Sequence, residues 1–226
     1  MKYLAPFLLL FLISSEVFCQ HVSSPDSVLT WLKTGNKEFV HGEFNVHGVD
    51  SSLRIGLSKE QHPKAVILTC SDSRVSPELI FDKGLGDLFV IRIAGNIADD
   101  AVVGSIEYAV EHLHTPLVVV MGHKNCGAIG AAVADLQKPE NEINNHIRVL
   151  TDKIELAIAT EKLNEKDFTQ KALLSNIIFT VSSLNQSRPV LSEAVKKGEL
   201  KVVGAVYDLA SGKVEWLKPA TMATQH

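Results

Sequence analysis

Two short segments carry side chains that can bind a metal ion. Cys70 begins the segment CSDSR after one apolar run, and His123 and Cys126 follow another. Two thiolates and an imidazole are a ligand set that zinc prefers. Three protein ligands leave one tetrahedral position open, as in catalytic rather than structural zinc sites. The spacing therefore predicts one catalytic Zn²⁺ ion per subunit.

The same segment contains two charged residues, Asp72 and Arg74. The Asp72 carboxylate can take the open metal position and exclude water, or it can turn to Arg74 and accept the proton of a zinc-bound water. A bidentate pair with the guanidinium would hold the carboxylate off the metal, so we expect the open arrangement. The alternative, an incidental surface ion pair, does not explain why both residues lie in the segment that supplies a ligand.

The first 19 residues read as a targeting segment. Lys2 precedes an apolar stretch over residues 4–13, which a polar stretch and Cys19 follow. This pattern is typical of a signal peptide, and we expect cleavage near Gln20 and export to the periplasm or the medium. The apolar stretch is shorter than the roughly 20 residues that a membrane-spanning helix needs, so no stable membrane insertion is expected.

Removal of the leader leaves Cys70 and Cys126 as the two thiols of the exported protein. An oxidising compartment makes a structural disulfide between them a real alternative to metal binding. We favour the metal, because a simple disulfide does not require Asp72, Arg74 and His123 at these offsets.

Composition limits the class of protein. Residues 20–226 have the length of one ordinary domain. Hydrophobic residues make up 46% and charged residues 21% of the 226-residue chain, and the formal net charge is −4. These values are typical of a folded soluble domain, and the lack of a basic cluster argues against nucleic acid as a partner.

Strands and helices are expected to alternate through the middle of the chain. Short apolar runs predict strands at residues 65–69, 87–94 and 117–121, and helices are expected between them, one starting at Ser76-Pro77 and one over residues 99–114. This alternation predicts an α/β fold with a parallel-core sheet flanked by helices. Cys70 and His123 then lie at the carboxyl ends of strands, where such sheets bind ligands. One helical turn is expected to bring Cys126 beside His123.

Flanking elements complete the expected scaffold. Amphipathic patterns predict helices over residues 24–40, 145–163 and 166–184. Two closing strands are expected at residues 200–207 and 213–217.

Several of these segments resemble conserved blocks of the β-class carbonic anhydrases. The resemblance is carried by CSDSRVSPE, GDLFVIRIAGN, GSIEYAV, GHKNCGAIGAA and VVGAVYDLASGKVEWL. It extends over most of the chain after the leader. It implies a Rossmann-like fold, a homodimer or higher even oligomer, and the reversible hydration of carbon dioxide to bicarbonate and a proton by zinc-bound hydroxide.

The resemblance also assigns residues. Cys70, His123 and Cys126 would bind zinc, and Asp72 with Arg74 would form the catalytic dyad. Two further positions match substrate-binding residues of plant-type members, Gln61 and Tyr108. We expect Gly95 and Gly127 to be positions of close backbone approach, and we add the Gly127 N–H as a possible substrate contact. Without the resemblance, Gln61 would be read as a solvated loop residue and Tyr108 as a core residue.

Other functions remain open on sequence alone. The same nucleophile can attack a carbon dioxide analogue such as carbon disulfide or carbonyl sulfide. A bicarbonate sensor or a zinc-binding module without turnover would use the same residues. Because two thiolates cancel the charge of Zn²⁺, we expect a hydratase of this kind to become more active as the pH rises above neutrality.

Overall fold

The computed structural model describes residues 24–43, 45, 49–137, 145–159 and 167–218. The predicted signal peptide at residues 1–19 lies outside this range. Within it, no helix has the length and apolar content needed to cross a membrane.

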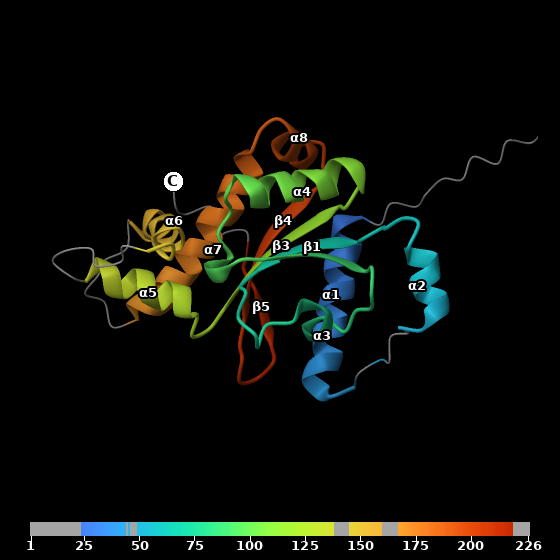
Figure 1. The fold of residues 1–226 in the computed structure, drawn as a ribbon, viewed down its shortest axis with the longest axis horizontal. Coiled ribbons are helices and arrows are strands. Elements are labelled where there is room, and N and C mark those ends of the chain that lie inside the picture. The colour runs from blue at the N-terminus through green and yellow to red at the C-terminus, as the bar shows by residue number, and fades with distance from the viewer. Residues whose placement is uncertain (1–23, 44, 46–48, 138–144, 160–166, 219–226) are drawn as a thin grey trace, which may run out of the picture.

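One five-stranded sheet forms the centre of the protein, with the strand order β2-β1-β3-β4-β5 (Figure 1). Strands β2, β1, β3 and β4 run parallel, and the last strand pairs antiparallel with β4. This arrangement confirms the predicted α/β fold with a parallel core. The strands are β1 (Ala65–Thr69), β2 (Leu88–Arg92), β3 (Leu117–His123), β4 (Lys201–Tyr207) and β5 (Val214–Trp216).

The strands are apolar on both faces, so the sheet has a core on each side. Alternate residues of β1 and β3, such as Val66 and Val118, face one core, and their neighbours Ile67 and Val119 face the other. The first core is covered by α4 (Asp100–His112), α5 (Gly127–Leu136), α6 (Arg148–Ile158), α7 (Phe168–Gln186) and α8 (Val190–Lys196). The second is covered by α1 (Pro25–His41) and α3 (Pro77–Ile80). Such two-sided burial explains why the central strands read as continuous apolar runs.

A buried amide ties α1 to the end of the sheet. Asn36 donates to the carbonyls of Ile80 (3.1 Å) and Gly212 (2.9 Å), and its own Oδ1 accepts from the N–H of Val214 (2.9 Å). Because these partners belong to α3 and to the β4–β5 hairpin, one side chain of α1 joins three segments that are far apart in the sequence.

Some expected elements differ in the structure. The helix expected at residues 145–163 begins later, at Arg148, and residues 160–163 lie outside the described range. The helix expected at residues 166–184 is α7, which extends to Gln186. Ser76 makes no side-chain capping bond, and α3 ends at Ile80. Two short helices, α2 (Ser51–Leu57) and α8, were not expected. All residues of α2 are at least partly exposed, and its apolar residues Leu53, Ile55 and Leu57 are two positions apart, which is not the spacing that predicts a helix.

Candidate metal centre

The carboxyl ends of β1 and β3 bring the first two metal-ligand candidates together. These strands are parallel neighbours, with Thr69 opposite Met121. The Thr69 hydroxyl donates to the Met121 carbonyl (2.8 Å), which locks the two strand ends side by side. Cys70 follows Thr69 directly, and His123 is the last residue of β3. Both ligand candidates therefore leave the same edge of the sheet, as the sequence predicted.

Cys126 reaches the cluster by a different route from the one expected. It does not lie one helical turn after His123, because the chain between them is a turn. Asn125 has a left-handed φ of 57°, and Cys126 is the extended N-cap residue of α5. The prediction of a shared helical turn was wrong, although the proximity that it implied is present.

Three donor atoms converge at this edge. The side chains of Cys70, His123 and Cys126 are buried, and one potential ligand atom from each lies within 4.8 Å of the others. The two sulfurs are 3.9 Å apart, and both thiols are free. Two sulfurs on one tetrahedral zinc, each at 2.3 Å, would be about 3.8 Å apart. The spacing therefore fits a shared zinc ion.

The imidazole of His123 is oriented for ligation. Its Nδ1 lies 3.0 Å from the carbonyl oxygen of Lys124, so an N–H at Nδ1 can donate to that oxygen. The ring is fully buried, and Nε2 has no hydrogen-bond partner among the described residues. A buried ring nitrogen without a partner is unfavourable unless something else binds it. This pattern, with one nitrogen on a carbonyl and the other free, is that of a metal-ligating histidine.

The electrostatics of the thiols also favour a cation. The hydrogen bond from Cys126 lowers the pKa of Cys70 to about 4 despite its burial, and His123 adds to this shift. The same hydrogen bond, together with burial, raises the pKa of Cys126. The two thiols therefore share one proton, because two buried thiolates at this distance repel each other. A divalent cation would remove this repulsion and allow both to ionise.

Asp72 and Arg74 form the bidentate pair that the sequence suggested. Arg74 Nε and Nη2 donate to the two carboxylate oxygens at 2.9 and 2.8 Å, and the Arg74 backbone N–H adds a third bond at 3.0 Å. These bonds hold the pKa of Asp72 well below its usual range. Asp72 Oδ2 is 3.8 Å from His123 Nε2, so the carboxylate borders the ligand cluster while its oxygens are engaged by Arg74.

Arg92 is a residue of this site that sequence reasoning missed. Its guanidinium donates to the carbonyls of Cys70 (3.3 Å) and Asp72 (2.6 Å), which fixes the backbone of the CSDSR segment. The register explains this position, because Arg92 lies opposite Thr69 at the end of β2. The sequence shows Arg92 at a strand end but does not show the pairing that places it there.

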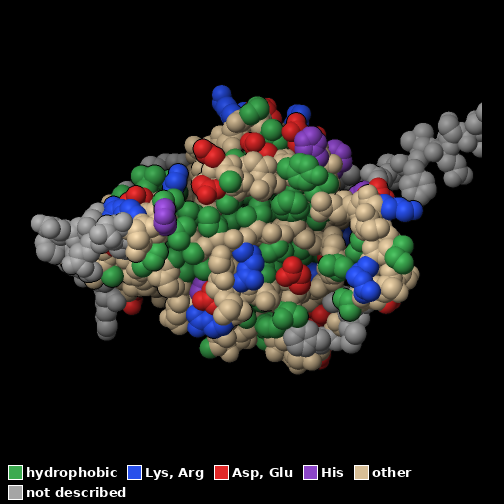
Figure 2. All heavy atoms as spheres, viewed as in Figure 1, with side chains coloured by type: hydrophobic (Ala, Val, Ile, Leu, Met, Phe, Trp, Pro, Cys, Tyr) green, Lys and Arg blue, Asp and Glu red, His purple; other side chains and the backbone are tan. Residues whose placement is uncertain are grey.

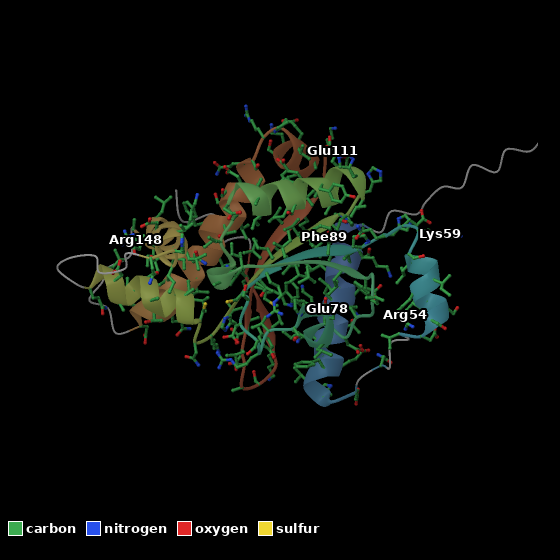
Figure 3. All side chains as sticks on the ribbon, viewed as in Figure 1. Arg54, Lys59, Glu78, Phe89, Glu111 and Arg148 are labelled. Atoms are coloured by element: carbon green, nitrogen blue, oxygen red, sulfur yellow. The ribbon has the colours of Figure 1, made fainter. Side chains whose placement is uncertain are left out.

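Two of the three predicted substrate-binding residues lie away from the cluster within one chain. Gln61 is exposed and precedes β1, at the opposite end of that strand from Cys70. Tyr108 is 47% exposed on α4, and its ring packs against Phe89 (6.4 Å between centroids) and His112 (5.2 Å). Figure 3 labels Phe89 beside α4.

Gly127 lies next to the cluster as the first residue of α5. A Cβ at this position would meet no atom within 4 Å, so the predicted close approach of protein backbone is absent here. The prediction of close approach is correct for Gly95, which has a φ of 76° and where a Cβ would lie 2.8 Å from Ile154.

A cavity of about 390 Å³ adjoins two of the ligand candidates. Its walls include His123 and Cys126, together with Ile129 of α5 and Gln170 and Leu173 of α7. The cluster is thus buried but borders open space large enough for small molecules.

Fold and site together define an α/β protein with a three-ligand centre suited to a soft or borderline metal. A family profile described as "Carbonic anhydrase" matches residues 65–214. The chain is 39% identical over 191 residues to carbonic anhydrase 2 of Mycobacterium tuberculosis, an alignment that covers 82% of this chain and 90% of that protein. It is 36% identical over 193 residues to a carbonic anhydrase of Mycolicibacterium smegmatis, with 85% and 93% covered.

Solved structures agree with these relatives. The β-carbonic anhydrase CcaA superposes with a TM-score of 0.66 at 29% identity, over 86% of this chain and 97% of that chain. A Coccomyxa β-carbonic anhydrase in complex with acetazolamide gives 0.66 at 28% identity, over 74% and 78%. A tetrameric β-carbonic anhydrase of Sordaria macrospora gives 0.64 at 26% identity, over 85% and 93%. The chain belongs to the β-class carbonic anhydrase family.

Proposed function

We propose that the protein catalyses the reversible hydration of carbon dioxide to bicarbonate and a proton, with one zinc ion per subunit held by Cys70, His123 and Cys126. The observation that carries this proposal is the convergence of two buried thiols and an unpartnered imidazole nitrogen within 4.8 Å. Membership in the carbonic anhydrase family supports the choice of reaction.

Each residue of the site has a distinct task in this proposal. Zinc, when bound, supplies a Lewis-acidic centre that makes water a stronger acid near neutral pH. Arg74 keeps Asp72 ionised and directs its carboxylate toward the edge of the cluster. Asp72 can then accept a hydrogen bond from the reacting water through Oδ2. The N–H of Gly127, at the first position of α5, has no acceptor within the helix and can donate to a bicarbonate oxygen.

Metal removal tests the proposed reaction. Stopped-flow carbon dioxide hydration by residues 20–226 is expected to fall to the uncatalysed rate after treatment with a zinc chelator, and to return when zinc is added, because the three protein donors cannot activate water alone. The rate should rise with pH above neutrality. Catalysis that survives complete removal of zinc, or zinc-loaded protein that hydrolyses carbonyl sulfide but does not hydrate carbon dioxide, would contradict the proposal.

We also propose that the working unit is a homodimer or a higher even oligomer built on β2. Among the described strands, β2 is an edge strand with only β1 beside it. Its side chains Phe89, Val90 and Ile91 are apolar but only half-buried. Leu85 and Tyr108 add exposed apolar surface, and Figure 2 shows hydrophobic side chains gathered across the middle of this face. An exposed apolar edge strand favours pairing with another chain. We take a second copy as the partner, since a similar solved structure is described as tetrameric.

A dimer of this kind would also explain Gln61 and Tyr108. Tyr108 packs on Phe89, three residues before Arg92, and therefore lies about 10 Å along the strand from the end of β2 that borders the site. Gln61 lies beyond the same amino-terminal end of the sheet. A two-fold axis perpendicular to β2 makes the two edge strands antiparallel, so that the amino-terminal end of one subunit meets the metal centre of the other. The partner's Gln61 and Tyr108 would then contact the substrate.

Subunit mixing tests this arrangement. Cys70→Ala subunits lack a metal centre, and Gln61→Ala/Tyr108→Phe subunits lack the donated side chains, so each homodimer is expected to be nearly inactive. If the side chains act across the interface, each mixed dimer has one complete site. Random exchange should then restore about a quarter of the wild-type activity. No recovery, with mixed dimers demonstrated by differential tagging, would show that these residues do not act across the interface.

A further inference from the structure

We propose that the ion pair between Lys124 and Asp208 is a positioning element of the metal centre. It holds the Lys124 carbonyl in the direction that orients His123 with Nε2 toward the metal. This inference rests on the proposed function, because it assigns to the pair a role in binding zinc.

The argument begins at the imidazole. The Lys124 carbonyl oxygen lies 3.0 Å from His123 Nδ1 and accepts its N–H, which leaves the lone pair on Nε2. Carbonyl or carboxylate partners of this kind fix both the tautomer and the ring angle of metal-ligating histidines. In this protein the partner is a backbone group one residue further along the chain. Its direction therefore depends on how the backbone of Lys124 is held.

Lys124 is held by two consecutive residues at the end of β4. Its N–H donates to the Tyr207 carbonyl (3.0 Å), and its Nζ donates to Asp208 Oδ2 (2.6 Å). Immediately afterwards the chain turns at Asn125, whose φ of 57° is uncommon for a residue other than glycine. The Lys124 carbonyl thus belongs to the peptide that joins Lys124, which β4 and Asp208 hold in place, to Asn125, whose backbone is constrained.

Asp208 is itself fixed in place. Its Oδ1 accepts from the N–H groups of Ala210 (2.9 Å) and Ser211 (3.1 Å), and its own N–H donates to the Lys213 carbonyl (2.9 Å). The β4–β5 turn therefore aims Oδ2 at Lys124. The hydrogen bond from Lys124, followed by the two backbone donors, lowers the pKa of Asp208 to about 2, so this carboxylate is ionised at neutral pH.

Because the Lys124–Asp208 pair is partly exposed to solvent, a role in positioning can be distinguished from a role in the stability of the fold. The Lys124 side chain is 40% exposed and that of Asp208 is 21% exposed. Ion pairs this open to solvent contribute little to the stability of the fold. Substitution should therefore leave the protein folded, and its effect should appear at the metal. Glu215 lies 3.9 Å from Lys124 Nζ and can partly replace Asp208, so Lys124 is the better residue to change.

The experiment compares Lys124→Met, which keeps the length of the side chain without its charge, with Lys201→Met as a matched control. The Lys201 side chain is 42% exposed and pairs with Asp26 (2.5 Å). Lys201 is the first residue of β4, at the opposite end of that strand from Asp208. Zinc affinity is measured by competition with a chromophoric chelator, and ligand geometry by the visible spectrum of the Co²⁺-substituted protein. Loss of an outer-shell partner weakens metal binding 10- to 100-fold, so we expect Lys124→Met to bind zinc about tenfold more weakly.

The zinc affinities of Lys201→Met and Lys124→Arg should remain within about twofold of the wild-type value. The arginine in Lys124→Arg can restore the ion pair with Asp208. Thermal unfolding of the metal-free proteins should be unchanged by all three substitutions. Unaltered zinc affinity and Co²⁺ spectrum in Lys124→Met would overturn this inference alone. So would an affinity loss matched by lower stability of the metal-free variant. Wild-type protein that binds no zinc would instead overturn the proposed function.

Discussion

Cys70→Ala is expected to abolish zinc binding and carbon dioxide hydration together. Structural zinc sites gain about 10–16 kcal/mol from four ligands, so one thiolate accounts for about 3 kcal/mol, or more than a hundredfold in affinity. The loss should be larger in effect here, because only three protein side chains converge. Zinc content by mass spectrometry and stopped-flow hydration should therefore fall in parallel.

Cys19→Ala is the matched control for Cys70→Ala. Cys19 is expected to lie in the leader, so its replacement in the full-length chain should change neither zinc content nor activity. Retention of a full zinc complement by Cys70→Ala would show that the metal is bound elsewhere. Wild-type activity in Cys70→Ala would show that the cluster of Cys70, His123 and Cys126 has no role in catalysis.

Arg74→Ala is expected to lower turnover about 10- to 100-fold, the usual range for loss of an outer-shell partner, while leaving about one zinc per subunit. The substitution removes the bonds that hold the Asp72 oxygens at 2.8–2.9 Å from the guanidinium. A released carboxylate at the edge of the cluster can compete with water for the open position. Turnover and zinc content should therefore separate, unlike in Cys70→Ala.

Two further variants sharpen this test. Arg74→Lys keeps the charge but cannot form the bidentate pair, so its turnover should lie between wild type and Arg74→Ala. Arg188→Ala removes an exposed guanidinium that follows the end of α7 farthest from the cavity, and should have no effect. Unchanged turnover in Arg74→Ala, or loss of zinc in step with activity, would contradict an orienting role for Arg74.

The stability that the Asp72–Arg74 pair contributes decreases when the pH is lowered. Arg74 lowers the pKa of Asp72 in the folded protein below its unfolded value of about 3.9. The pair therefore contributes stability at all pH values above the unfolded pKa, and that contribution is lost as the pH falls toward the folded one. Neutral and alkaline assays consequently compare variants in a range where wild-type Asp72 stays ionised.

The parts of the fold that could be predicted from sequence are those governed by local patterns. The run Ala65–Thr69 is buried on both faces, and its prediction matches β1 residue for residue. The ligand candidates were found because residue type and strand-end position both pointed to them. Neither signal depends on knowing which distant segments meet.

The features that escaped prediction depend on tertiary pairing. Arg92 serves the site through its register with Thr69, and Lys124 meets Asp208 across 84 residues of sequence. The turn at Asn125 stands where a helical turn was expected. Both conformations bring residues three apart into proximity, so the sequence spacing alone could not distinguish them. Tyr108 illustrates the same limit, since its exposed position in one chain gains a role only if a second chain is present.

The most direct test of the central claim is a crystal structure of the zinc-loaded protein at about pH 8, above the range in which carboxylates are protonated. We predict one zinc ion per subunit, bound by Cys70 Sγ, Cys126 Sγ and His123 Nε2, with solvent or a small anion in the fourth position and Asp72 still paired with Arg74. A disulfide between the two cysteines in place of the metal, or an Asp72 oxygen in the fourth position at this pH, would contradict the account.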